Sequence, residues 1–225
     1  MTSGTFQVSV IIPTYNRADF LVETLESVFS QTVPPYEVLV VDDGSTDETE
    51  AVMGSWSDRL RYVRQENQGV AVARNFGLRL ARGEWVAYLD SDDLWTPEKI
   101  ERDQETHERH PTAQVLYGGS RRMLSGQVGR ALLPPDVSDR FLEALAMRNT
   151  LCASGVTVRR DALIATSGFR EDTELGPSAD WELWVRLAAR YEFAFTHAAT
   201  LLVREQPWLN AVIRERPLPP AKTKV

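Results

Sequence analysis

Short apolar runs alternate with amphipathic stretches along the first half of the chain. The first run, VSVIIP at 8–13, is rich in β-branched residues and is typical of a strand buried on both faces of a parallel sheet. Apolar residues then recur at helical spacing through 20–31, and the prolines that follow end this helix. The same order repeats three times, with strands predicted within 36–45, 60–65 and 84–93 and helices within 45–53, 67–83 and 96–110.

Four strand-then-helix units predict an α/β fold with a Rossmann-like, doubly wound and mostly parallel sheet. Such sheets bind ligands beyond the carboxyl ends of their strands, and each polar cluster of the first half falls at such an end. Ser45 and Glu48 have the spacing of a capping box, which predicts the start of the second helix.

The second half is less regular and predicts a smaller mixed region. Strands are expected within 113–119, 193–197 and 200–205, helices within 138–149 and 178–191, and a strand leading into a short helix within 154–169. We therefore predict a single domain over 1–215, made of halves at 7–95 and 112–205. The Pro-rich, basic end at 216–225 is expected to be a disordered tail.

The composition is that of an ordinary globular protein, with 43% apolar and 25% charged positions among 225 residues. A net charge of −7 gives no general electrostatic reason to bind nucleic acid or an anionic membrane. The single cysteine, Cys152, excludes an internal disulfide and fits a reducing compartment. The sequence shows no signal peptide and no apolar run long enough to span a bilayer. We predict a cytoplasmic protein. Peripheral contact with the inner face of a membrane is compatible with this prediction.

The stretch YLDSDDLW at 88–95 places three carboxylates in four positions directly behind an apolar run. Residues two apart in a strand face the same way, so Asp90 and Asp92 are expected to converge while Ser91 points elsewhere. Two convergent carboxylates form a natural site for Mg²⁺ or Mn²⁺, because these hard cations prefer oxygen ligands. The alternative is a solvated loop in which Asp92 or Asp93 caps the next helix.

A second pair of acids ends the second predicted strand. Asp42 and Asp43 precede Gly44, which permits close backbone approach. Either carboxylate could accept hydrogen bonds from a nucleotide base or a ribose hydroxyl. The alternative is an Asx-turn that caps the next helix.

The first strand and the third helix add further polar candidates. Thr14, Tyr15 and Arg17 follow the first strand and offer stacking and polar contacts. Arg74 could reach a phosphate from the third helix, unless it is a solvated helical cation.

Five motifs together resemble glycosyltransferase family 2, a large inverting family with the GT-A fold. They occur in the family's order and spacing and span roughly residues 7–190: VSVIIPTYNR, VVDDGSTDET, NQGVAVARNFGL, YLDSDDLW and ADWELWVRL. The resemblance implies a nucleotide-sugar-binding half at 7–95 and an acceptor and catalytic half at 112–205. It also implies a divalent cation, Mn²⁺ or Mg²⁺.

The resemblance carries roles over to particular residues. Asp92 is the implied metal ligand, and Asp180 is the implied general base. His197 is a candidate third metal ligand, although a lone histidine at a strand end is more often structural or exposed. The expected contacts to the nucleotide-sugar donor are Pro13, Thr14, Tyr15, Arg17, Asp42, Asp43, Asn67, Gly69, Arg74, Asp90 and Ser91.

The chemistry of sugar transfer supports these roles. Negative charge builds on the departing diphosphate, and a metal held by Asp92 would stabilise it as a Lewis acid. The acceptor hydroxyl loses a proton as it attacks, which a carboxylate such as Asp180 can assist. The position of Asp180 at a helix start is also explained by the helix dipole alone. The family commonly has an acid before this aspartate, where this chain has Ala179, and Glu182 is a less suitable substitute base.

The expected function is therefore metal-assisted, inverting transfer from a nucleotide-diphospho-sugar, most simply a UDP-sugar, to a glycan, a lipid-linked acceptor or a small molecule. One alternative function is a sugar-nucleotide-binding module without turnover. A homodimer is a separate expectation, since a second subunit would cover apolar surface of the second half. A sugar-phosphate nucleotidyltransferase is less suitable, because PTYNRADF at 13–20 is not the Gly-rich loop that it needs. We expect the pocket that selects the donor sugar to be formed by residues 117–122 and 152–155.

Overall fold

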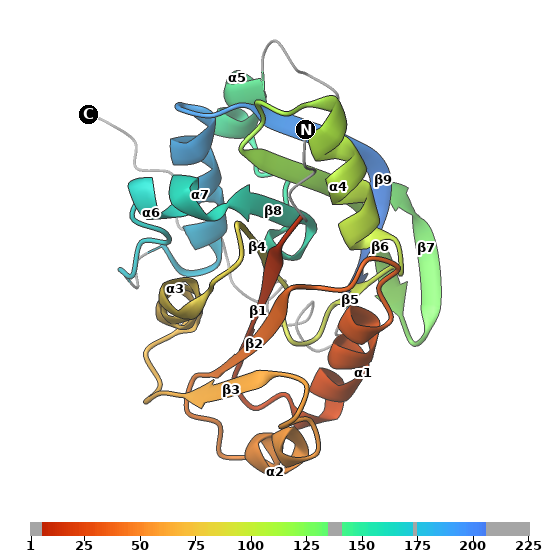
Figure 1. The fold of residues 1–225 in the computed structure, drawn as a ribbon, viewed down its shortest axis with the longest axis vertical. Helices are drawn as coiled ribbons and strands as arrows, with labels where there is room; N and C mark the ends of the chain where they lie inside the picture. The colour runs from red at the N-terminus through yellow and green to blue at the C-terminus, as the bar shows by residue number, and fades with distance from the viewer. Residues whose placement is uncertain (1–5, 135–140, 173–174, 206–225) are drawn as a thin grey trace, which may run out of the picture.

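A single mixed sheet runs through the computed structural model, which describes residues 6–134, 141–172 and 175–205 (Figure 1). Its strands lie in the order β3-β2-β1-β4-β8-β6-β9-β5, and β7 pairs with β6 outside this path. The predicted tail at 216–225 lies outside the described residues. The strands are β1 (Val8–Thr14), β2 (Glu37–Asp42), β3 (Arg61–Arg64), β4 (Trp85–Tyr88), β5 (Leu94–Trp95), β6 (Val115–Leu124), β7 (Gln127–Leu132), β8 (Val156–Arg159) and β9 (Phe193–Arg204).

The two halves of the sheet differ in strand direction. Strands β3, β2, β1 and β4 are mutually parallel, as the repeated strand-then-helix pattern predicts. Beyond β4 the sheet is mixed, because β8 runs antiparallel to both β4 and β6 while β9 runs parallel to β6. The predicted α/β class, with a parallel first half and a smaller mixed second half, is confirmed.

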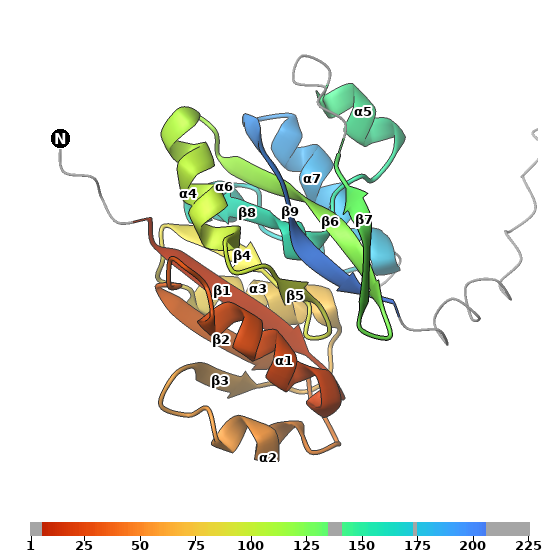
Figure 2. The same ribbon diagram turned by 90° about the vertical axis from the view of Figure 1, so that its right-hand side faces the viewer.

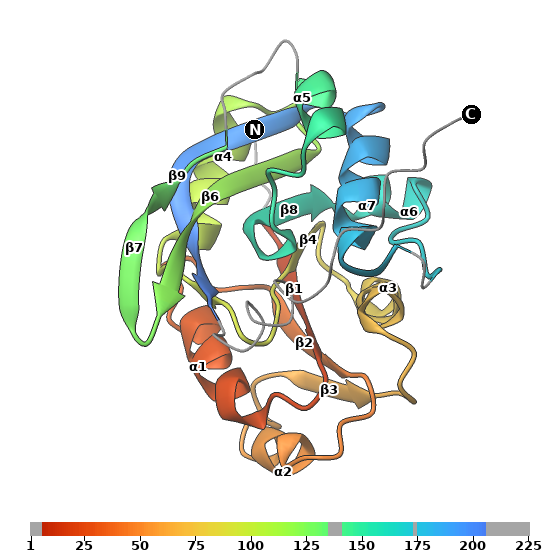
Figure 3. The same ribbon diagram turned by 180° about the vertical axis from the view of Figure 1, so that it is seen from behind.

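Helices cover both faces of the sheet (Figures 1 and 3). Side chains of β1 alternate between the two faces: Val10 and Ile12 join the apolar cluster that contains Leu25 of α1, whereas Ile11 joins the one that contains Leu78 of α3. Burying each such side chain contributes about 1.5–3 kcal/mol. The helices are α1 (Ala18–Phe29), α2 (Thr49–Gly54), α3 (Val70–Leu80), α4 (Lys99–Arg109), α5 (Phe141–Met147), α6 (Arg160–Ala165) and α7 (Ala179–Ala188), with 3₁₀ turns at Ala153–Gly155 and Gly176–Ser178. None of the described helices is long and apolar enough to cross a membrane.

Two local predictions are corrected by the structure, and two strands were not predicted. The two closing strands expected at 193–197 and 200–205 are one strand, β9, interrupted by a bulge where His197 has φ 53°. The capping box is wrong: the Ser45 hydroxyl accepts a hydrogen bond from the Asn16 amide, and Asp47 accepts the Thr49 amide at the start of α2. The short strand β5 and the exposed strand β7, which forms a hairpin with β6 (Figure 2), were not predicted.

Candidate active site

A cleft of about 320 Å³ opens at the carboxyl ends of β1 and β4. The ends of β1 and β2, the first turn of α3 and the loop after β4 form its walls. Its lining combines most of the predicted donor contacts with the predicted metal ligand: Pro13, Thr14, Tyr15, Arg17, Asp43, Val70, Ala73, Arg74, Asp90, Ser91 and Asp92. Polar side chains from four separate segments, between Thr14 and Asp92, therefore converge at one edge of the sheet.

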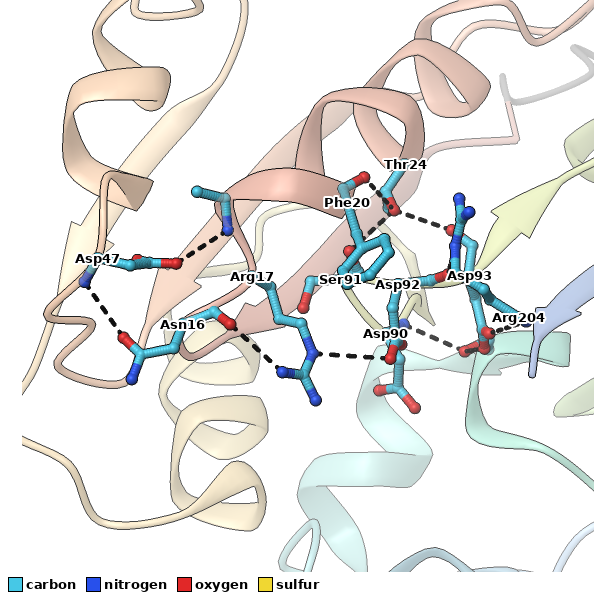
Figure 4. A network of polar contacts seen from close by, with 12 residues as sticks. Asn16, Arg17, Phe20, Thr24, Asp47, Asp90, Ser91, Asp92, Asp93 and Arg204 are labelled. Carbon is cyan, nitrogen blue, oxygen red and sulfur yellow. Dashed lines mark hydrogen bonds and ion pairs between the residues drawn. The ribbon is translucent and has the colours of Figure 1, made fainter. Parts of the chain in front are cut away.

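The end of β1 supplies an exposed ring and a buried hydroxyl to the cleft. The Tyr15 side chain is 46% exposed, whereas Thr14 is buried and its Oγ1 has no hydrogen-bond partner within the described structure. A buried polar atom without a partner costs free energy, so a bound ligand that pairs with it would be favoured. The adjoining turn is held in place because the Asn16 side-chain oxygen accepts the Thr46 amide at 2.8 Å and the Asp47 amide at 3.3 Å, the second of which is drawn in Figure 4.

Asp42 and Asp43 have different environments because successive strand residues point to opposite sides. Asp42 is fully buried, where it accepts hydrogen bonds from the Tyr62 hydroxyl and the Ser45 amide, and it does not line the cleft. Asp43 does line the cleft, and it accepts the Gly69 amide at 2.7 Å just before α3. The structure therefore leaves only Asp43 of this pair in a position to meet a ligand.

Asn67 and Gly69 shape the cleft without lining it. Gly69 has φ 94°, a backbone conformation that favours glycine, and it directly precedes α3. Asn67 is exposed, and its backbone nitrogen would lie 3.0 Å from a Cβ added at Gly44. The turn at Gly44 and the turn at Asn67 can therefore pack closely because Gly44 has no side chain.

Arg74 forms the cationic centre of the site. Its guanidinium donates to Asp90 at 2.6 Å and lies over the ring of Phe169 at 5.1 Å. Although burial opposes the charged form, the carboxylates of Asp90 and Asp180 raise the pKa of Arg74. The residue is 6% exposed, which excludes the alternative of a solvated helical cation.

The carboxylates of the loop after β4 have separate partners (Figure 4). Asp92 lies 3.7 Å from the Arg17 Nε atom, and burial together with the charge of Asp90 raises its pKa. Asp93 is 5% exposed and accepts the Ser154 hydroxyl at 2.7 Å and the Arg204 amide at 3.2 Å. Burial, followed by Asp90, raises the pKa of Asp93 to about 8. Asp93 is therefore a buried structural acid and not a helix cap.

The donor atoms at the cleft fit a hard divalent cation that takes its remaining ligands from a substrate. Burial and then the charge of Asp90 raise the pKa of Asp92, and a bound cation would offset both by favouring the charged form. Within the described ranges, no three His, Cys, Asp or Glu side chains are grouped so as to hold a metal ion. Mg²⁺ is commonly held by one or two carboxylates together with substrate phosphates, which matches this arrangement.

His197 is not brought to this cleft. It lines a different hollow, of about 480 Å³, that also includes Arg102 and Arg121. Its ring packs against Phe195, with 4.6 Å between the ring centroids. The expected pairing of His197 with Asp92 is not formed, because the bulge in β9 places the histidine in this second hollow.

Asp180 occupies the first turn of α7, in the same electrostatic cluster as Arg74 and Asp90. Its Oδ1 atom accepts the Trp181 amide at 2.6 Å and the Asn149 side-chain amide at 3.3 Å. Burial raises the pKa of Asp180, which brings its proton affinity closer to neutral pH. Glu182 is engaged by Arg186 at 2.7 Å through both of its oxygens and is poorly suited as a substitute base.

Ser154 and Asn149 donate hydrogen bonds to Asp93 and Asp180, roles that the sequence did not predict. Ser154 is fully buried, and besides donating to Asp93 it accepts the Asp90 amide at 3.1 Å. Asn149 reaches Asp180 from the segment after α5. Both lie outside the polar clusters at the ends of the parallel strands, so strand-end reasoning had no signal for them.

The architecture and the cleft first define the class of protein. A parallel Rossmann-like half joined to a smaller mixed half is the arrangement of GT-A glycosyltransferases. Staphylococcus aureus TarS in complex with UDP superimposes with a TM-score of 0.72 at 24% identity, covering 89% of this chain and 61% of that chain. The mannosyltransferase PcManGT from Pyrobaculum calidifontis, in complex with GDP-Man and Mn²⁺, superimposes at 0.71 and 23% identity, covering 96% and 67%. At these identities the likeness establishes the fold.

The chain belongs to glycosyl transferase family 2, whose family model matches residues 9–143. A glycosyltransferase of Rickettsia bellii is 33% identical over 189 residues, which is 80% of this chain and 27% of that protein. TuaG of Bacillus subtilis, named for teichuronic acid biosynthesis, is 43% identical over 148 residues, or 64% of this chain and 55% of TuaG. The chain thus spans about half the length of TuaG and about a quarter of the Rickettsia protein. The family resemblance predicted from the five motifs is confirmed.

Proposed function

We propose that this domain transfers a sugar from a nucleotide-diphospho-sugar, specifically a UDP-sugar, to an acceptor hydroxyl with inversion at the anomeric carbon. The observation that carries the proposal is the grouping of Arg74, Asp90 and Asp180: Arg74 and Asp90 line the cleft, and the carboxylates of Asp90 and Asp180 both raise the pKa of Arg74. A cation and a cleft carboxylate lie on the donor side, and a half-buried carboxylate lies at the start of α7. Sugar transfer needs groups that stabilise the leaving diphosphate and a base that accepts the acceptor proton, both within reach of the anomeric carbon.

The donor would lie along the ends of β1 and β2. In this pose the Tyr15 ring and the Asp43 carboxylate face the nucleoside, and the orphaned Thr14 hydroxyl gains a partner. Arg17 and Arg74 offset the charge of the diphosphate. A divalent cation at Asp92, Mn²⁺ or Mg²⁺, would supply Lewis-acid stabilisation of the departing diphosphate.

The acceptor would be activated by Asp180. Both hydrogen bonds that Asp180 accepts from described residues go to Oδ1, which leaves Oδ2 for the acceptor hydroxyl. The acceptor oxygen forms a bond to the anomeric carbon while the bond from that carbon to the diphosphate oxygen breaks, and Asp180 receives the hydroxyl proton. A raised pKa suits this role, because a general base works best when its pKa is near the working pH.

Calorimetric titration with UDP and with GDP, each with and without Mn²⁺, tests the donor site. We expect metal-dependent binding of UDP that is lost in Asp92→Ala and kept in Asp58→Ala, since Asp58 is exposed and lies away from the cleft. Both nucleotides are needed, because TarS was crystallised with UDP and PcManGT with GDP-Man. If neither UDP nor GDP binds under any condition, the proposal is contradicted.

Turnover separates the enzyme from a binding module. Incubation with UDP-sugars and a panel of acceptors, followed by NMR of the product anomer, is expected to show the configuration opposite to that of the donor. Retention of configuration would contradict a single displacement. Nucleotide binding without UDP release from any donor would instead favour a module that binds sugar nucleotides without turnover.

A further inference from the structure

A third hollow, of about 430 Å³ and distinct from the one that contains His197, lies between β6 and the segment 148–152. It shares no lining residue with the cleft. Asn149 lines this hollow and donates to Asp180, so its contents lie next to the proposed base. Cys152 also lines it, and burial together with the carboxylates of Asp93 and Asp90 raises the pKa of the Cys152 thiol. The hollow and the cleft therefore approach the same acidic cluster from two sides.

The lining of this hollow is cationic and rich in hydrogen-bond donors. Arg122 and Arg148 line it together with Ser120, Asn149 and Thr150, and no carboxylate of the described chain is part of that lining. This composition contrasts with the net charge of −7 of the whole chain and with the three aspartates that line the cleft. Two cations without an acid in the wall favour a negatively charged occupant.

Both arginines have donors left for a ligand. The Arg122 side chain is 66% exposed, and its Nη1 atom contacts Glu205 at 2.6 Å, which engages part of the guanidinium fork. The Arg148 side chain makes no hydrogen bond or ion pair with the described residues. An arginine offers five N–H donors in a planar fork that matches the geometry of a phosphate or a carboxylate.

We propose that this hollow binds the acceptor and that the acceptor is an anionic hydroxyl compound, whose phosphate or carboxylate lies against Arg122 and Arg148 while its hydroxyl points to Asp180. The inference rests on the proposed function, because it takes Asp180 as the base. During transfer the acceptor oxygen gains the bond to the anomeric carbon, its proton moves to Asp180, and the nucleoside diphosphate leaves with the electrons of the broken bond. The anionic group of the acceptor is unchanged.

Binding of small probes to the UDP- and Mg²⁺-loaded protein tests the inference by ¹⁵N NMR. Glycerol 3-phosphate and glucuronate are the anionic probes, and glycerol and glucose are their neutral counterparts. We expect shifts at the amides of Thr150 and Cys152 for the anionic probes alone. The variant with both Arg122→Gln and Arg148→Gln should bind them at least tenfold more weakly. Arg121→Gln is the matched control, because this neighbour on β6 lines the hollow that contains His197.

The outcomes separate the two proposals. Binding of glycerol 3-phosphate or of glucuronate, lost in the double variant and kept in Arg121→Gln, supports the inference and identifies which acid group is recognised. Equal shifts with the neutral probes, no shifts with any probe, or equal weakening in Arg121→Gln would overturn it while UDP binding leaves the donor site intact. If UDP itself does not bind, the proposed function fails and the inference fails with it.

Discussion

Replacing Asp93 with asparagine is expected to flatten the pH dependence of stability. The pKa of Asp93 is raised from 3.8 to about 8, first by burial and then by Asp90. Between these values the folded protein holds a proton that the unfolded chain has lost, so the free energy of unfolding falls as pH rises through this window. One pKa unit corresponds to about 1.4 kcal/mol, so the total is about 6 kcal/mol, and about 3 kcal/mol is lost between pH 5 and pH 7.

Urea denaturation in EDTA, at half-unit steps from pH 5 to pH 8, measures this slope. Asparagine resembles the protonated acid and can still accept the Ser154 hydroxyl, so Asp93→Asn should fold and gain stability relative to the native chain as pH rises. Asp58→Asn removes the same charge from an exposed position and should keep the native slope. Parallel slopes in the native protein and Asp93→Asn would refute the reasoning, because they would mean that Asp93 is already ionised when folded.

Three further substitutions address catalysis and stability. Asp180→Asn is expected to abolish transfer, measured as UDP release with acceptor, while UDP affinity by calorimetry stays within about threefold, since the base acts on the acceptor. Arg74→Met removes a charge that lowers the pKa of Asp180, so the acid limb of the pH profile of kcat/KM should move up by about one pH unit. An unmoved limb would contradict the electrostatic effect of Arg74 on Asp180. Lys99→Met strands the buried Asp103 carboxylate and should cost about 3–5 kcal/mol in urea unfolding, whereas exposed Arg102→Gln should cost less than about 1 kcal/mol.

The parallel half of the fold could be predicted because burial on both faces leaves a plain sequence signal. Strands such as β1 are continuous apolar runs, and the helices between them repeat at 3.6-residue spacing. Strand β7 carries no such signal, since all of its residues are exposed and its pairing depends on β6 alone. The continuity of β9 was also hidden, because the residues that bulge out around His197 read as a break between two strands.

The candidate site was predictable to the extent that strand ends converge. Position within a motif could not say which of Asp42 and Asp43 faces the cleft, because that depends on the register of β2 and on the partners that each side meets. Tyr62 comes from β3 and fixes Asp42 inward, while the turn before α3 holds Asp43 at the opening. Asn149 comes from the mixed half, whose contacts are set by the packing of α5 against α7 and not by any local pattern.

The crowded acids after β4 show how neighbours divide one motif into separate functions. Asp90 is held by Arg74, a contact that balances its charge without burying it, since its side chain is 35% exposed. Burial and then the charge of Asp90 favour the protonated form of Asp93 and raise its pKa to about 8, while its hydrogen bond with the Ser154 hydroxyl fixes the loop. Asp92 lines the cleft, lies 3.7 Å from the Arg17 Nε atom and has a raised pKa. A cation bound at Asp92 would favour its charged form against burial and the charge of Asp90, and the proposed reaction places the metal there for this reason.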